Sequence, residues 1–283
     1  MSDRLAIIPH YLMPKRAMTA FGGLVASSRM GAVTTAIIRW FVGHYGVDMS
    51  EAADPQIAHY DSFNSFFTRA LREGARPLAS ADWLCPVDGA ISQFGRIAGE
   101  QIFQAKGHQY SASTLLGDDP ALARQFRDGN FATLYLSPKD YHRIHMPCAG
   151  RLLRMRHVPG TLFPVKPLTA RMVPGLFARN ERVVCVFETA HGPLVMVLVG
   201  ATIVGSMATV WHGVVNPPRV GEIREWRYED QDIRLQQGDE MGRFLLGSTV
   251  VMLLPSALQF NAGWQAGGSV RMGEAMADKA PTA

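Results

Sequence analysis

The sequence has too few cysteines for a disulfide framework and too little charge for a nucleic-acid binder. Its three cysteines, Cys85, Cys148 and Cys185, are widely spaced in 283 residues and form no C-x-x-C pair. This spacing predicts neither a disulfide scaffold nor a zinc cluster, and it suits a reducing compartment. Charged residues make up 18% of the chain and the formal net charge is +4, which leaves no dense lysine and arginine stripe for nucleic acid. An apolar content of 47% excludes intrinsic disorder.

Several common functional motifs are also absent. The sequence contains no G-x-G-x-x-G loop after a strand, no Walker loop, no H-E-x-x-H pair and no G-x-S-x-G elbow. These absences exclude the most frequent nucleotide-binding, zinc-protease and hydrolase patterns. Near the N-terminus, Pro9 and Pro14 interrupt the apolar stretch, and the layout of a secretory signal is missing. No cleaved signal is therefore expected.

One long uncharged run needs a structural explanation. Residues 192–218 contain no Asp, Glu, Lys or Arg, which is long enough for a membrane span. Glycines and β-branched residues divide the run into LVMVLVGA and IVGSMATVWHGVV. Short β-rich runs of this kind are typical of core strands. The pattern favours two buried strands, and no transmembrane helix is predicted.

Apolar spacing predicts helices first and strands afterwards. Residues 14–29 and 32–45 place apolar side chains at helical intervals, and Ser62 is positioned to cap a third helix over 63–73. From about residue 84 to 256, short β-rich runs alternate with Gly, Pro and Asn. The fold class is therefore α+β, with N-terminal amphipathic helices followed by a mostly antiparallel β-rich body.

The first 50 residues carry most of the surplus positive charge, with five basic residues against two acidic ones. Basic amphipathic helices suit an anionic membrane surface, and the same pattern also fits two ordinary helices packed on a core. The expected divisions of the chain are N-terminal helices over 1–60, a β-rich body over 61–272 and a flexible tail over 273–283.

Two histidines stand in the segment LSPKDYHRIHMPCAG, residues 136–150. Ser137 and Asp140 predict a single helical turn before a strand, which places His142 and His145 on different elements. A metal site would need both imidazoles on one face together with further ligands, so no metal is expected. Imidazoles at a strand end are suited to acid and base chemistry near neutral pH, or they are structural groups held by backbone carbonyls.

An aspartate and a serine complete the candidate set. Asp88 precedes Gly89 in the segment CPVDGAISQFG, and such a pair by itself is typical of a turn. Ser248 follows Gly247 directly before the β-forming run TVVML. Its hydroxyl could attack the preceding carbonyl if a base took the proton. Asp88, His145 and Ser248 would then act as orienter, base and nucleophile.

These segments together resemble phosphatidylserine decarboxylases of the bacterial, membrane-associated type. Six blocks occur in that family's order and span most of residues 60–255. They are FFTRALREGARP at 66–77, CPVDGAISQFG at 85–95, QAKGHQYSASTLLG at 104–117, LSPKDYHRIHMPCAG at 136–150, FARNERVV at 177–184 and GRFLLGSTVV at 242–251. The joint match is far more specific than any single block, and no departure falls at a position that matters to the chemistry.

The resemblance implies that the chain is made as a proenzyme and cleaves itself between Gly247 and Ser248. Cleavage would leave a β chain of residues 1–247 and an α chain of residues 248–283. Ser248 would be converted into an N-terminal pyruvoyl group, the covalent cofactor of the reaction. That group would form a Schiff base with the amino group of phosphatidylserine and accept the electrons released when CO2 leaves.

The resemblance also implies a role for each candidate residue. His145 would deprotonate Ser248 while Asp88 orients His145, and the hydroxyl would attack the preceding carbonyl to give an ester. His142 is the candidate donor of the proton that the former α-carbon receives, because the ordinary pKa of histidine suits reversible transfer near neutral pH. Hydrolysis would then release phosphatidylethanolamine.

A diacyl-lipid substrate implies a peripheral enzyme on the cytoplasmic side of the cell membrane, docked by its basic N-terminal helices. Arg179 could meet a lipid phosphate, or equally form a surface ion pair with Glu181. A homodimer is expected from family analogy alone. Two other classes stay open: a serine hydrolase using Asp88, His145 and Ser248 on an uncut chain, and a membrane-surface binding module that would tolerate Ser248→Ala.

Overall fold

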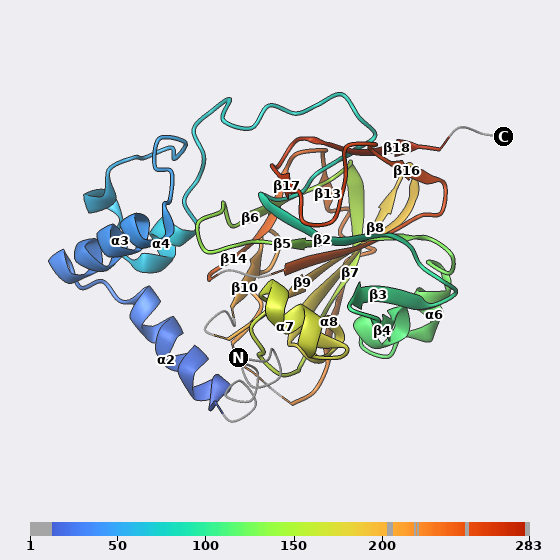
Figure 1. The fold of residues 1–283 in the computed structure, drawn as a ribbon, viewed down its shortest axis with the longest axis horizontal. Helices are drawn as coiled ribbons and strands as arrows, with labels where there is room; N and C mark the ends of the chain where they lie inside the picture. Colours follow the sequence, from blue (N-terminus) through green and yellow to red (C-terminus); the bar gives the residue numbers. More distant parts are fainter. Residues whose placement is uncertain (1–12, 203–205, 218, 220, 247–248, 281–283) are drawn as a thin grey trace.

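The structure, a computed structural model, describes residues 13–202, 206–217, 219, 221–246 and 249–280. The N-terminal helices come first along the chain and lie to one side of a body made mostly of antiparallel strands (Figure 1). The predicted α+β class is confirmed. The helices are α2 (Lys15–Ser27), α3 (Ala32–Tyr45), η1 (Ile57–His59), α4 (Phe63–Phe67), α5 (Ala112–Leu115), α6 (Pro120–Arg124), α7 (Pro167–Met172) and α8 (Leu176–Arg179).

The strands form one large sheet, two smaller sheets and a hairpin, all with antiparallel pairing. In spatial order the large sheet holds β12 (Arg224–Arg227), β7 (Gly150–Val158), β8 (Arg182–Thr189), β9 (Gly192–Val199), β15 (Thr249–Leu254), β5 (Asn130–Tyr135), β2 (Gly89–Arg96) and β17 (Ser269–Val270), with β13 (Arg234–Leu235) also on β7. The second sheet holds β11 (Gly213–Val214), β10 (Met207–Thr209), β14 (Glu240–Phe244) and β6 (Arg143–His145). The third holds β1 (Trp83–Leu84), β18 (Ala275–Lys279) and β16 (Leu258–Phe260), and β3 (Gln101–Ala105) pairs with β4 (His108–Ser111).

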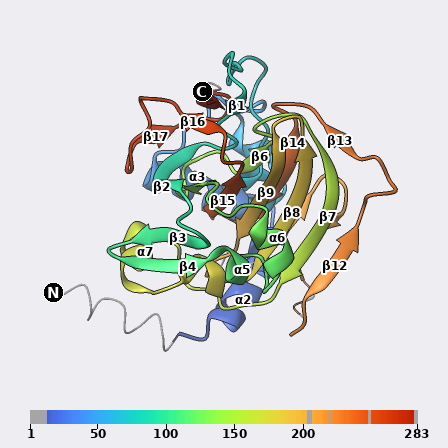
Figure 2. The ribbon, with the colours of Figure 1, turned by 90° about the vertical axis from the view of Figure 1, so that its right-hand side faces the viewer.

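The central strands β8, β9 and β15 of the large sheet are buried on both faces, which explains their continuous apolar runs. Along β15, Val250 and Met252 point into a core shared with the second and third sheets. Val251 and Leu253 point into a core shared with the β3–β4 hairpin and helices α5 to α8, which lie against the other face (Figure 2). β15 pairs with β5 on one side and β9 on the other, so the residues after position 248 are locked into the centre of the fold.

The uncharged run over 192–218 forms strands in the described residues, as expected, but only part of it is buried. β9 is a long core strand with six consecutive buried residues. The second half gives the short strands β10 and β11, and both residues of β11 are exposed at the sheet edge. The prediction of two buried strands is therefore right for β9 and wrong for the edge at β11.

The two long N-terminal helices match the predicted ranges. No single helix of the described residues is long and apolar enough to cross a membrane, and α2 and α3 reach that length and composition only as a pair bent by 113°. Apolar residues of α3 contribute to a small separate core in which Ile38, Val47, Phe66 and Phe67 are buried. Leu246 packs against the same core, which brings the chain just before position 247 to the helical part of the molecule.

The third predicted helix is real but shorter than expected. Ser62 caps α4 as predicted, in a reciprocal capping box with Ser65. The helix ends at Phe67, whereas the apolar spacing predicted a helix to residue 73. The reason is that the following backbone bonds elsewhere: Arg72 donates its backbone N–H to the carbonyl of Glu51 at 2.9 Å.

The prediction of a flexible tail over 273–283 is wrong for most of the described residues in that range. Ala275–Lys279 forms β18, which lies between β1 and β16 in the third sheet. Met276 is fully buried there in the same core as the large sheet. Small and polar residues suggested fraying, but strand pairing and one apolar anchor fix this segment.

Candidate active site

Asp88 lies directly before β2, and its side chain is 10% exposed. The Asp-Gly pair opens a strand here and does not form the turn that its composition suggests. A side chain at Gly89 would place a Cβ atom 2.3 Å from the backbone oxygen of Tyr135. Glycine is required because the two strands approach closely at this point.

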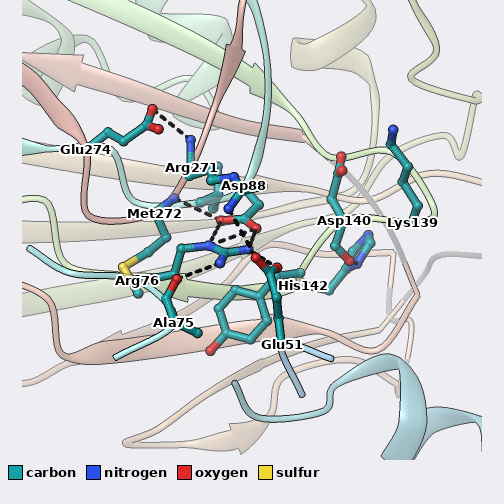
Figure 3. Close-up of polar contacts among 12 residues, drawn as sticks. Glu51, Ala75, Arg76, Asp88, Lys139, Asp140, His142, Arg271, Met272 and Glu274 are labelled. Carbon is teal, nitrogen blue, oxygen red and sulfur yellow. Dashed lines mark hydrogen bonds and ion pairs between the residues drawn. The ribbon is translucent and has the colours of Figure 1, made fainter. Parts of the chain in front are cut away.

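Arg76 binds both oxygens of the Asp88 carboxylate (Figure 3). Its Nε donates to Oδ1 at 3.0 Å and its Nη2 donates to Oδ2 at 2.5 Å. The same guanidinium donates to Glu51 Oε2 and to the Ala75 carbonyl, each at 2.7 Å. Hydrogen bonding to Asp88 raises the pKa of Arg76, and hydrogen bonding to Arg76 lowers the pKa of Glu51. Arg76 therefore joins the two carboxyl groups in one hydrogen-bonded network.

The region after position 248 contributes to the same network. The backbone N–H of Met272 donates to Asp88 Oδ1 at 2.9 Å, and Arg271 reaches Glu51 at 3.1 Å. Asp88 is thus bound by two segments nearly 200 positions apart in the chain, and Figure 3 shows Arg76 and Met272 meeting at its carboxylate. This arrangement fixes the position of the Asp88 side chain.

His145, at the end of β6, has both ring nitrogens engaged. Nδ1 lies 2.8 Å from the Gly238 carbonyl oxygen and Nε2 lies 3.0 Å from the Tyr141 hydroxyl. Because a carbonyl only accepts, the ring proton is assigned to Nδ1, and Nε2 accepts from Tyr141. Burial lowers the pKa of His145 and raises that of Tyr141. The imidazole is therefore a neutral base whose tautomer is set by Gly238.

His142 is fully buried and has one nitrogen without a partner. Its Nδ1 donates to the Asp140 carbonyl at 2.7 Å, and its Nε2 has no hydrogen bond within the described part of the chain. The ring packs on Phe67 with 4.0 Å between ring centroids. Burial lowers the pKa of His142 to about 3. The expectation of a pKa near neutrality for this residue is therefore wrong, and Nε2 is a bare acceptor at neutral pH.

The turn before β6 sets the position of both histidines. Ser137 donates its backbone N–H to the Asp140 carboxylate at 2.6 Å, and Asp140 donates its own backbone N–H to the Ser137 carbonyl at 3.0 Å. These bonds close one turn, but the segment is not the helical turn predicted from its capping pattern. The prediction that His142 and His145 lie on different elements is confirmed, since only His145 belongs to a strand.

The predicted residues come together only in part. Among the described residues no hydrogen bond joins Asp88 to His145, although the negative charge of Asp88 is close enough to favour the protonated imidazole. Gly247 and Ser248 lie outside the described residues. Their neighbours are placed: Phe244 donates its backbone N–H to the His142 carbonyl at 3.1 Å, and Thr249 begins β15.

An apolar cavity of about 500 Å³ lies between the N-terminal helices and the β body. Its wall includes Leu246, one residue before Gly247, and Phe67, which packs on His142. Helices α2 and α3 supply much of the remaining lining, including Phe21, Val25, Ile37, Trp40 and Phe41. A cavity of this size and character is suited to an apolar portion of a ligand.

Sequence reasoning missed the groups that hold the predicted residues. Arg76 belongs to the FFTRALREGARP block and Tyr141 stands directly before His142, but neither pattern shows what the side chain contacts. Arg179 is exposed and lies over the Phe163 ring. The alternative ion pair of Arg179 with Glu181 does not form among the described residues, where the Glu181 carboxylate pairs with His157 and Arg219.

Comparison with known proteins places this site in a family. The family model described as phosphatidylserine decarboxylase matches residues 63–278, and a second model, described as PSD, matches residues 5–46. A protein of Variovorax paradoxus named phosphatidylserine decarboxylase proenzyme is 71% identical over 281 residues, covering 99% of both chains. Proteins with the same name from Delftia acidovorans and Albidiferax ferrireducens are 69% identical over 99% of both chains and 68% identical over 100% of both. The chain therefore belongs to the phosphatidylserine decarboxylase family.

Proposed function

We propose how this chain performs the decarboxylation of phosphatidylserine, the activity of its family. The proenzyme cleaves itself between Gly247 and Ser248 into a β chain of residues 1–247 and an α chain of residues 248–283. Ser248 becomes a pyruvoyl group, and the mature enzyme converts phosphatidylserine into phosphatidylethanolamine and CO2. The observation that carries the proposal is the buried, unpartnered Nε2 of His142 beside the chain that leads to position 247.

Self-cleavage uses His145 as the base. Its Nε2 exchanges the hydrogen bond from Tyr141 for one from the Ser248 hydroxyl and takes that proton. The hydroxyl oxygen attacks the Gly247 carbonyl carbon, so that the acyl group moves from nitrogen to oxygen. The ester then breaks by elimination, and hydrolysis releases the nitrogen of Ser248 as ammonia. The Gly238 carbonyl holds the tautomer that leaves Nε2 free of a proton. Asp88, fixed by Arg76, supplies the negative charge that stabilises the imidazolium.

The residues near position 248 fit a pyruvoyl group. Such a group supplies an electrophilic carbonyl that accepts the electrons released when the carboxylate leaves as CO2. Phe67 and Leu246 form apolar walls of the adjoining cavity, and the buried His142 ring that packs on Phe67 carries an open acceptor. With its pKa lowered to about 3, His142 is neutral at rest. It takes up at Nε2 the proton that the ammonium group of the substrate loses on becoming a nucleophilic amine, and it afterwards donates that proton to the former α-carbon. Water supplies the proton that the product amine needs when it leaves.

Intact-mass measurement of the purified chain tests this proposal. We expect two fragments that divide at Gly247, with the smaller one lighter than an unmodified peptide starting at Ser248 by the mass of one ammonia. A hydrazine probe should label that new end. Ser248→Ala should leave one uncut, inactive chain. A preparation that decarboxylates phosphatidylserine with only the uncut chain present would overturn the mechanism and favour a hydrolase-like use of Ser248.

We further propose that the enzyme is peripheral, on the cytoplasmic side of the cell membrane, with α2 and α3 as the dock. Phe21, Leu24 and Trp40 are 70%, 68% and 61% exposed, which is unusual for side chains of this size. Arg16 and Arg39 are exposed on the same two helices, and arginines are attracted to anionic lipid. The apolar cavity bordered by these helices then receives an acyl chain of the substrate.

Vesicle flotation tests the dock. The wild-type chain should float with vesicles containing phosphatidylglycerol, and a variant with Phe21→Ser, Leu24→Ser and Trp40→Ser should stay in the soluble fraction while still cleaving itself. Equal flotation of both would contradict the proposal. A matched control is Val210→Ser with Val214→Ser, which changes exposed apolar residues on β10–β11 and leaves the helices intact. The homodimer stays a prediction, which light scattering of the purified enzyme can measure.

A further inference from the structure

Arg69 is a buried arginine without a carboxylate partner. Its residue is 5% exposed, yet its Nε has no hydrogen-bond partner among the described residues. Its Nη2 makes one long hydrogen bond, 3.5 Å to the Lys139 carbonyl, and its guanidinium lies over the Phe66 ring at 5.3 Å. No ion pair joins it to an acidic group in the described part of the chain. An unpaired buried charge is costly, so such a group commonly has a binding role.

The arrangement places Arg69 next to the proposed site of reaction. Arg69 reaches the carbonyl of Lys139, and His142 bonds the carbonyl of the next residue, Asp140. The positive charge of Arg69 also contributes to lowering the pKa of His142. Two buried groups with unused bonding capacity therefore meet at the turn before β6, Arg69 from the segment after α4 and His142 from the chain that follows the turn. One is a donor, Arg69, and the other is an acceptor, Nε2 of His142.

We infer that Arg69 binds an oxyanion of the substrate headgroup. The inference rests on the proposed function and adds a residue for recognising the substrate. A guanidinium offers paired N–H donors that match the two oxygens of a carboxylate or a phosphodiester. Phosphatidylserine carries both groups. A lipid without a matching anion would leave the charge of Arg69 buried and unpaired, so the site would reject it.

The experiment measures binding separately from maturation. Arg69→Gln and Arg69→Lys are compared with Arg72→Gln, a control in the same segment whose side chain is exposed. We expect all three variants to cleave themselves, as judged by mass. Arg69→Gln should raise the KM for phosphatidylserine in mixed micelles about 10- to 100-fold, the usual cost of losing a hydrogen bond to a charged group. Arg69→Lys should give a smaller increase because it keeps the charge and loses the planar donor pair, and kcat should change less than KM.

Phosphatidylethanolamine as an inhibitor identifies the anion, because it retains the phosphodiester and the amine but lacks the carboxylate. If its inhibition constant rises with the KM in Arg69→Gln, Arg69 binds the phosphodiester. If only the KM for phosphatidylserine rises, Arg69 binds the carboxylate. A mature Arg69→Gln enzyme with wild-type KM would overturn the inference, and so would Arg69 variants that stay uncut. Neither result contradicts the proposed function as long as the wild-type chain divides into the two expected fragments.

Discussion

The two sides of the site differ in how their buried charges are satisfied. At Asp88, the carboxylate, Arg76 and Glu51 are bonded to one another. At His142, a lone pair and the neighbouring guanidinium of Arg69 have almost no partners among the described residues. A fully bonded network holds one geometry. Buried polar groups without hydrogen bonds destabilise the fold until another molecule or segment bonds to them. The Asp88 side therefore holds side chains in place, and the His142 side is open to bind a group of the substrate.

The largest effect on self-cleavage and turnover should come from removing each of the two histidines in turn. His145→Ala removes the proposed base, so the chain is expected to stay uncut, as is Asp88→Ala. His142→Ala should cut at least in part and then turn over poorly. His59→Ala, which changes an exposed histidine, is the control and should behave like wild type. Fragment masses and CO2 release from labelled substrate measure both steps. If the two histidine results were exchanged, their roles would be the reverse of those proposed.

Breaking the paired side should cost stability as well as activity. The Arg76 and Asp88 side chains are 5% and 10% exposed, so Arg76→Met leaves a buried carboxylate without its cation. We expect a loss of about 3 to 5 kcal/mol in the free energy of unfolding, measured by urea denaturation of the uncut Ser248→Ala chain. Adding Asp88→Asn to Arg76→Met should recover much of that loss. If the double variant is no more stable than Arg76→Met alone, the ion pair is not the cause.

The buried histidines should make the free energy of unfolding depend on pH. The pKa of His142 is lowered to about 3 in the folded chain, and that of His145 is lowered too. Between the folded and unfolded pKa values, the unfolded chain binds more protons, so the free energy of unfolding falls as the pH drops below about 6.5. Each such histidine contributes up to about 1.4 kcal/mol per pH unit. His142→Gln should reduce the slope measured from pH 6.5 to 5, and an unchanged slope would contradict the burial of a neutral imidazole.

The sequence predicted the types of group at the site better than their partners. Helical spacing, the cap at Ser62 and β-rich runs predicted the α+β order because these signals are local. The pairing of Asp88 with Arg76 and Met272 depends on strands that meet across nearly 200 positions, and no local pattern specifies it. The low pKa of His142 was missed for a similar reason, since burial against Phe67 comes from α4, far from the histidine in the chain. The tail was mispredicted because its pairing with β1 and β16 is also long-range.

The smallest expected effect tests whether burial, and not charge alone, makes the Asp88 side rigid. Arg271 pairs with Glu51 at 3.1 Å, as Arg76 does at 2.7 Å, but the Arg271 side chain is 61% exposed. Arg271→Gln should therefore lower the free energy of unfolding by less than about 1 kcal/mol, and the difference should shrink in high salt. The loss caused by Arg76→Met should persist in high salt, because water and ions do not reach a buried pair. If Arg271→Gln slowed self-cleavage as much as Arg76→Met, the network would act as one unit, and the exposed pair would be as important to Asp88 as the buried one.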